Sequence, residues 1–156
     1  MKAVIQRVQK ASVEVDSKVI GKIDLGFLVL LGVEEEDTIK DLDYILKKVT
    51  SLRIFSDSDN KMNLNLSQVN GSILLVSQFT LLASTRKGNR PSFNLAANPK
   101  KANEYYNLMI KKLKEANFNV ETGEFGAEMQ VSLINDGPVT ILLNSFDQKI
   151  PRKVQN

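Results

Sequence analysis

Two apolar runs constrain the fold more than any other feature of this sequence. Residues 27–31 (Phe-Leu-Val-Leu-Leu) lie between Gly26 and Gly32 and have no polar face, and residues 73–76 (Ile-Leu-Leu-Val) form a second such run. Short apolar runs bounded by turn residues are typical of strands that are covered on both sides. We therefore predict that residues 27–31 lie centrally in a sheet, with residues 73–76 as a second buried strand.

Two amphipathic helices are predicted beside these strands. Thr38 and Asp41 have the spacing of a capping box before residues 39–49, and Asn98 and Pro99 are typical of a helix start. Apolar residues then recur at intervals of three and four, which indicates one buried face on each helix. These residues are Ile39, Leu42, Ile45, Leu46 and Val49, and Ala102, Tyr105, Tyr106, Met109, Ile110 and Leu113.

The other periodic segments predict strands. Alternation in the first fifteen residues indicates two short strands, followed by a third at residues 19–23. Residues 131–134 and 139–143 are predicted to form a β-hairpin-like pair joined by residues 135–138. A chain of mainly strands with two packed helices is expected to have an α+β fold.

Composition excludes several kinds of active site. The chain has no His and no Cys, so Ser-His-Asp and Cys-His arrangements are impossible. A zinc site would need carboxylates alone, and the acidic residues form no spaced cluster beyond residues 34–37. The net charge of +3, with paired Lys and Arg, is compatible with a polyanionic partner, although helical lysine pairs are also typical of solvated faces. We expect no metal and no cofactor.

Length and hydropathy indicate a single domain outside membranes. The 156 residues suit one domain, and residues 1–5 are too short for the apolar part of a signal peptide. No apolar run approaches the roughly 18 residues that a membrane span requires. We expect a soluble, cytoplasmic protein with no membrane partner.

Two polar segments adjoin the apolar runs. Ser77-Gln78-Phe79-Thr80-Leu81 follows one predicted strand, and Asn135-Asp136-Gly137-Pro138-Val139-Thr140 separates the last two. Taken alone, the first is compatible with the polar end of an ordinary strand and the second with a turn. The first also fits an oxyanion site, because donors at a strand end can stabilise a developing negative charge.

These segments closely resemble the signature motifs of the D-aminoacyl-tRNA deacylases, Ser-Gln-Phe-Thr-Leu and Asn-x-Gly-Pro-Val-Thr. The resemblance covers residues 1–144, which we expect to form one domain, and leaves residues 145–156 as a basic C-terminal extension. It implies a homodimer with a β-rich sandwich or barrel-like core of mainly antiparallel strands and two helices packed outside. Similar agreement occurs at residues 5–8, 11–13, 30–33, 53–55, 61–63, 90–93 and 129–131.

The resemblance also implies a reaction, hydrolysis of the ester bond between a D-amino acid and tRNA. Its catalytic segment would be Ser77 to Thr80, in which backbone N–H groups around Phe79 and Thr80 bind the oxyanion and Gln78 helps to hold the 3′ end. In the family the 2′-hydroxyl of the terminal adenosine assists. Thr80 is then expected to position the substrate, since a threonine nucleophile needs an adjacent base and the chain has no His.

Stereospecificity is implied to come from the second segment. In the family the bond that matches Gly137-Pro138 is cis, and its two carbonyl oxygens enter the active site of the other subunit. There they exclude L side chains, whereas achiral glycine can enter. Arg7 matches the position that steadies this element, although alone it is equally compatible with a surface arginine.

Further residues are predicted to bind the substrate. Arg90, Ala96 and Ala97 are expected to shape the pocket for the terminal adenosine, and Asn135 belongs to the second motif. Phe125 and Met129 are expected to line the cavity, with a simple core role as an equal alternative. The expected partner is an aminoacyl-tRNA, contacted through its 3′-terminal adenosine and acceptor stem.

Two rival functions fit the residues themselves. A small, basic, β-rich domain is also typical of a non-catalytic RNA-binding module, although aromatic residues make up only 6% and no Lys/Arg-Gly-Phe/Tyr stacking motif is present. A threonine hydrolase acting on a small ester would require an activated Thr80.

Overall fold

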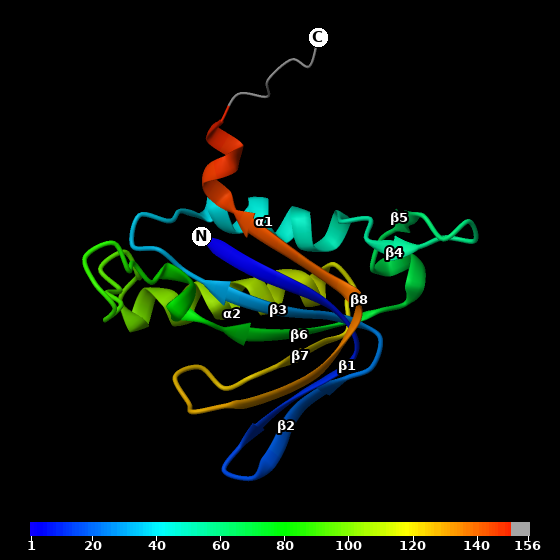
Figure 1. Ribbon diagram of the computed structural model, residues 1–156, viewed down its shortest axis with the longest axis horizontal. Coiled ribbons are helices and arrows are strands. Elements are labelled where there is room, and N and C mark those ends of the chain that lie inside the picture. The colour runs from blue at the N-terminus through cyan, green and yellow to red at the C-terminus, as the bar shows by residue number, and fades with distance from the viewer. Residues whose placement is uncertain (151–156) are drawn as a thin grey trace.

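A six-stranded sheet that curls into a nearly closed barrel forms the centre of the molecule (Figure 1). The computed structural model describes residues 1–150. In the sheet, β1 is antiparallel to β2, β3 and β8, whereas β3, β6 and β7 run parallel. The strands are β1 (Lys2–Val15), β2 (Lys18–Ile23), β3 (Gly26–Gly32), β6 (Ser72–Ser77), β7 (Val120–Thr122) and β8 (Gln130–Asn144).

The strands β2 and β7 approach each other and almost close the barrel. A Cβ atom added to Gly21 of β2 would lie 2.6 Å from the carbonyl oxygen of Thr122 in β7, so a glycine is needed for this approach. The predicted α+β fold with a barrel-like core is therefore confirmed. It is mainly antiparallel, since three of the five strand pairings in this sheet are antiparallel.

Both predicted helices are present on the outside of the sheet (Figure 1). Helix α1 (Ile39–Ser51) begins with the predicted capping box, in which the Thr38 N–H donates to the Asp41 carboxylate at 2.9 Å. Helix α2 (Pro99–Glu115) begins with Asn98, whose side-chain oxygen accepts from the Lys101 N–H. The two helices pack together on one face of the sheet, where they cover the apolar strands.

Two hydrophobic cores lie on the two faces of this sheet. Phe27 of β3 and Ile73 of β6 belong to the core under the helices. Leu28 and Leu74, their neighbours along the chain, belong to the core inside the barrel. Because side chains alternate along a strand, apolar residues at every position fill both cores. The predicted central position of residues 27–31 is confirmed, since β3 lies between β1 and β6.

The N-terminal strand differs from the prediction of two short strands. It is one 14-residue strand with a shift of register against β8 between Val8 and Lys10, so Gln9 forms a bulge. One extra residue turns the side chains that follow it to the opposite face. Ile5 accordingly packs under the helices and Ala11 packs inside the barrel. The point in the sequence where the alternation of apolar and polar residues changes phase therefore marks this bulge and does not mark the end of a strand.

The C-terminal strand differs from the predicted hairpin. Both halves belong to β8 and pair with β1, not with each other. Gln6 pairs with Thr140, and Val8 pairs with Asn135. Two residue steps along β1 therefore lie opposite five residue steps along β8, so β8 has three extra residues here. Because β1 is long enough to pair with both halves of β8, the chain does not have to fold back on itself between them. We call residues 135–139 the β8 excursion.

Short elements complete the described chain. Ser145 begins η3, and its N–H donates to the carbonyl oxygen of Met1 at 2.9 Å. The predicted extension at 145–156 thus begins with a short helix against the N-terminus, while residues 151–156 lie outside the described residues. The division at residue 144 stays a prediction. The other short elements are β4 (Phe55–Ser56), β5 (Met62–Leu64), η1 (Ser67–Val69), η2 (Phe79–Leu82) and η3 (Ser145–Lys149).

No helix within residues 1–150 has the length and hydropathy to cross a membrane.

Candidate active site

A cavity of about 510 Å³ opens where β3 and β6 end, beside the beginning of α2. Its walls are mainly apolar, and the polar groups come from the end of β6 and from Tyr106 of α2. The structure therefore brings the first sequence motif and much of the predicted substrate site into one cavity. The predicted residues that line it are Ser77, Gln78, Phe79, Ala96, Ala97, Phe125 and Met129.

The first motif changes from strand to helix at the cavity wall. The Gln78 N–H still continues the sheet and donates to the Leu31 carbonyl at 2.7 Å. The first hydrogen bond of η2 then runs from the Leu81 N–H to the Gln78 carbonyl at 3.2 Å. The intervening N–H groups, those of Phe79 and Thr80, precede the first helical bond and lie where helix termini leave donors without intrahelical partners. The Phe79 N–H thus belongs to a residue that lines the cavity, and the Thr80 N–H follows it directly along the chain.

Thr80 itself is exposed and lies outside the residues that line the cavity. The side-chain amide of Gln78 donates a hydrogen bond to the Thr80 hydroxyl oxygen. This contact ties the two polar side chains of the motif together. It provides a donor to the hydroxyl and no base that would remove its proton.

Tyr106 lies at the cavity wall and was predicted only as part of the apolar stripe of its helix. Its hydroxyl donates to the carbonyl oxygen of Leu75 at 2.8 Å and lies 3.3 Å from that of Gly123. Burial raises the pKa of the Tyr106 phenol to about 12, so it stays neutral at ordinary pH. The residue fastens α2 to the strands that carry the cavity. No sequence signal separates it from its apolar neighbours, because its partners lie far away along the chain.

A second wall is held by main-chain bonds between two loops. The Ala97 N–H donates to the Val33 carbonyl at 2.9 Å, and the Glu35 N–H donates to the Leu95 carbonyl at 3.0 Å. The Glu35 carboxylate also accepts from the Asn98 N–H at 2.9 Å. These bonds place Ala96 and Ala97 beside the end of β6. Glu35, which the sequence indicated only as part of the acidic cluster at residues 34–37, is one of the residues that hold this wall.

An aromatic pair lies where the cavity meets solvent. The rings of Phe79 and Phe93 pack edge to face with centroids 5.0 Å apart, and the Phe79 side chain is 58% exposed. Phe93 belongs to the loop that also carries Arg90. Arg90 is exposed and does not line the cavity, so the structure brings its loop, but not its side chain, to the predicted adenosine pocket.

The second motif lies at a different place from the cavity. Figure 1 shows that β6 ends on the left-hand side, whereas β8 turns at the right-hand side. The Gly137-Pro138 peptide bond is cis and Gly137 has a φ of 122°, a conformation that favours glycine. Asn135, Gly137 and Pro138 are exposed, and none of them lines the cavity of its own chain. Their roles in substrate selection stay predictions.

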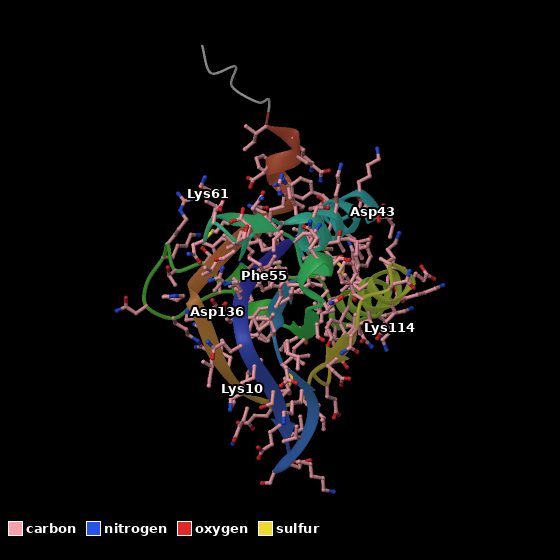
Figure 2. The ribbon with its side chains drawn as sticks, turned by 90° about the vertical axis from the view of Figure 1, so that its right-hand side faces the viewer. Lys10, Asp43, Phe55, Lys61, Lys114 and Asp136 are labelled. Atoms are coloured by element: carbon pink, nitrogen blue, oxygen red, sulfur yellow. The ribbon has the colours of Figure 1, made fainter. Side chains whose placement is uncertain are left out.

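Arg7 connects the β8 excursion to β1 and to the segment around Ile54. Its Nε donates to the Asp136 carbonyl at 3.0 Å and forms an ion pair with the Asp136 carboxylate at 3.0 Å. Another guanidinium nitrogen donates to the Ile54 carbonyl, and the group lies over the Phe55 ring. Phe55 and Asp136, which both contact Arg7, are labelled in Figure 2. Arg7 is only 7% exposed, so it is not the surface strand arginine of the alternative interpretation. It contacts the element that the resemblance assigned to it.

Within residues 1–150 no group of three or more His, Cys, Asp or Glu residues is placed to hold a metal ion.

The barrel-like fold and a cavity lined by a Ser-Gln-Phe strand end define a small α+β domain whose candidate site contains no histidine. Comparison with known proteins identifies its family. The profile of the D-Tyr-tRNA(Tyr) deacylase family matches residues 4–144. The chain belongs to this family.

Individual relatives agree with this assignment. The chain is 57% identical over 148 residues to a "D-aminoacyl-tRNA deacylase" of Kosmotoga olearia, covering 95% of this chain and 99% of the relative. A protein of the same description from Thermosipho africanus is 54% identical and covers 93% and 97%. A solved structure described as "c-Myc DNA Unwinding Element Binding Protein" superposes with a TM-score of 0.87 at 42% identity, covering 92% and 98%.

Proposed function

We propose that this protein hydrolyses the ester bond that joins a D-amino acid to the 3′ end of tRNA. The observation that carries this proposal is the cavity at the end of β6, where the motif of a D-Tyr-tRNA(Tyr) deacylase family member presents backbone donors beside an apolar space. The relatives described as D-aminoacyl-tRNA deacylases provide the reaction and the class of substrate. The proposed location is the cytoplasm, where aminoacyl-tRNA is made.

In the proposed reaction, water attacks the carbonyl carbon of the ester. The N–H groups of Phe79 and Thr80 stabilise the negative charge on the carbonyl oxygen of the tetrahedral intermediate. The bond to the ribose oxygen then breaks, and this oxygen leaves with a proton as the 3′-hydroxyl of tRNA. The adjacent 2′-hydroxyl of the substrate assists, which suits a site without a histidine base. Ser77 and Gln78 position the ester.

We propose a positioning role for Thr80. The hydroxyl accepts a hydrogen bond from Gln78 and lies outside the cavity lining, both of which argue against attack on a bound ester. A threonine nucleophile would also need a neighbouring base. These observations weigh against a threonine hydrolase.

For chiral selection we propose a homodimer in which Gly137 and Pro138 of one subunit enter the cavity of the other. Support comes from their exposure, their separation from the cavity of their own chain and the firm attachment of the excursion by Arg7. The carbonyl pair would exclude an L side chain and admit a D-amino acid or achiral glycine. Asn135 would act at the same subunit interface. Selection of this kind works by rejecting the wrong isomer.

The alternative is a non-catalytic nucleic-acid-binding module. The description of one solved relative as a DNA unwinding element binding protein favours this possibility. Both functions need a nucleic-acid surface, but only the deacylase needs the donors at the end of β6.

One assay tests these functions together. The protein is incubated with D-Tyr-tRNA, L-Tyr-tRNA, Gly-tRNA and free D-tyrosine ethyl ester, and the release of amino acid is followed. We expect rapid cleavage of D-Tyr-tRNA, slower cleavage of Gly-tRNA and protection of L-Tyr-tRNA and of the free ester. Binding without cleavage would favour the non-catalytic module, and equal cleavage of the free ester would favour a threonine hydrolase. The mass in solution tests the dimer.

A further inference from the structure

The charges of this chain are distributed very unevenly along the sequence. Residues 60–103 contain six Lys or Arg and no Asp or Glu. The rest of the chain contains fifteen Lys or Arg and eighteen Asp or Glu. The net charge is therefore +6 in a segment that includes the whole of the first motif and −3 elsewhere. A local excess of this size indicates an anionic partner far better than the overall charge of +3 does.

Half of these cations lie in one loop beside the cavity. Arg86, Lys87 and Arg90 belong to residues 85–92, all of which are exposed. Within residues 1–150, the ion pairs involve the Met1 amino group, Lys2, Arg7, Lys111 and Lys112, and no cation of this loop. Their charges are thus not neutralised by the described part of the chain.

The loop is anchored at both ends to the cavity. Ser84 and Ser92 exchange two main-chain hydrogen bonds of 2.8 and 3.0 Å, which close the base of the loop. Phe93 follows directly and packs against Phe79 of the motif. In Figure 1 the green loop after β6 extends outward from the end of the molecule where that strand stops. A ligand that leaves the cavity past Phe79 meets this loop first.

Acidic residues lie on other segments around the cavity. Phe125 and Met129 line the cavity, and Glu124 and Glu128 beside them in the sequence are exposed. Glu35, which holds the wall beside Ala97, is exposed as well. A chain of phosphates that leaves the cavity would be repelled by these carboxylates and attracted to the cations of residues 85–92.

We propose that residues 85–90 form the surface that binds the phosphates of the tRNA acceptor stem while the 3′ end occupies the cavity. This inference rests on the proposed function, because it takes the ester in the cavity as the end of an RNA chain. Cationic loops bind duplex RNA through its phosphate backbone with little regard to sequence. The helix lysines Lys111 and Lys112, which have carboxylate partners, are not part of this surface.

The test compares two double variants of equal charge. Arg86→Gln with Lys87→Gln removes two cations from the loop, and Lys18→Gln with Lys22→Gln removes two exposed cations from β2, which lies at the lower edge of Figure 1. Both variants lower the net charge from +3 to +1. Binding of uncharged tRNA is measured by fluorescence anisotropy over a range of salt concentrations, and KM and kcat are measured with D-Tyr-tRNA. D-tyrosyl-adenosine, an ester without phosphate, reports whether the cavity is intact.

We expect the loop variant to bind tRNA about tenfold more weakly at low salt, with a log-log salt slope shallower by about 1.4 to 1.8. KM for D-Tyr-tRNA should rise in parallel, with the β2 variant close to wild type. An unchanged affinity and slope in the loop variant, equal losses in both variants, or no binding of tRNA by the wild type would each overturn the proposal. Loop-dependent tRNA binding without hydrolysis of D-Tyr-tRNA would instead overturn the proposed function and leave the binding surface standing.

Discussion

The cavity and the β8 excursion hold the two sequence motifs by different means. Around the cavity, main-chain bonds join four segments, for example from Gln78 to Leu31 and from Ala97 to Val33. The polar contacts of the excursion come from one side chain, Arg7, which bonds to both Asp136 and Ile54, and Val139 packs into the core under the helices. The difference teaches that a single side chain matters more for the stability of the excursion, whereas the cavity is sensitive chiefly to its backbone.

The largest effect is expected from removing one backbone donor in the cavity. Phe79→Pro deletes the N–H at the first position of η2, where a proline ring is compatible with the start of a helix. We expect kcat for D-Tyr-tRNA to fall on the order of 100 to 1,000-fold. Phe79→Ala, which loses the ring but keeps the N–H, is the matched control. Equal rates in the two variants would remove this donor from the mechanism.

The next effect tests the polar anchor of the excursion. Arg7→Ala leaves the Ile54 carbonyl and the Asp136 carboxylate without their cation, and we expect a loss of about 3 kcal/mol in the free energy of unfolding. Urea unfolding followed by circular dichroism measures it. Arg7→Lys keeps the charge but not the forked geometry, so it should lose less. A stability equal to wild type in Arg7→Ala would mean that the excursion is held by its own backbone.

A smaller effect is expected for the one cavity side chain that bonds across segments. Tyr106→Phe removes a hydrogen bond to Leu75, whose carbonyl keeps a second donor in the Gly123 N–H, so we expect a loss of about 1 kcal/mol. The pKa of this phenol is raised from 10.0 to about 12. The contribution of the neutral phenol to the free energy of unfolding is therefore complete below pH 10 and is lost as the pH rises toward 12. Unfolding curves at several alkaline pH values should show this loss in the wild type and not in the variant.

The smallest effect is expected for Thr80→Ala. The hydroxyl bonds to Gln78 outside the cavity lining, so the variant should keep most of its deacylase activity. Mass spectrometry after rapid quench of the wild type provides an independent check. A covalent aminoacyl group on Thr80 would revive the nucleophile interpretation.

Local patterns predicted those parts of the fold that local interactions determine. The capping box at Thr38, the helix start at Asn98 and the unbroken apolar run of β3 each depend on residues close in sequence. The bulge at Gln9 and the pairing of β8 depend on which strand lies alongside, and no residue in either strand specifies its neighbour. The hairpin was therefore a reasonable prediction that was wrong.

In the candidate site, too, residues within a local motif could be predicted, whereas residues whose roles depend on distant segments could not. Its motif could be found by resemblance, and the end of a buried strand was the right place for it. Tyr106 and Glu35 were missed because their roles arise from carbonyl and N–H groups that the fold brings from distant segments. A tyrosine in an apolar stripe has the same pattern whether its hydroxyl is bonded or not.

The bulge in β1 also has a consequence for how the molecule unfolds. Because β1 packs Ile5 under the helices and Ala11 inside the barrel, neither core can be exposed without disturbing a strand that the other needs. We therefore expect the packing of one core to depend on the packing of the other. We expect a single cooperative transition, in which backbone amides of β1, β3 and β6 exchange with solvent only when the whole domain opens.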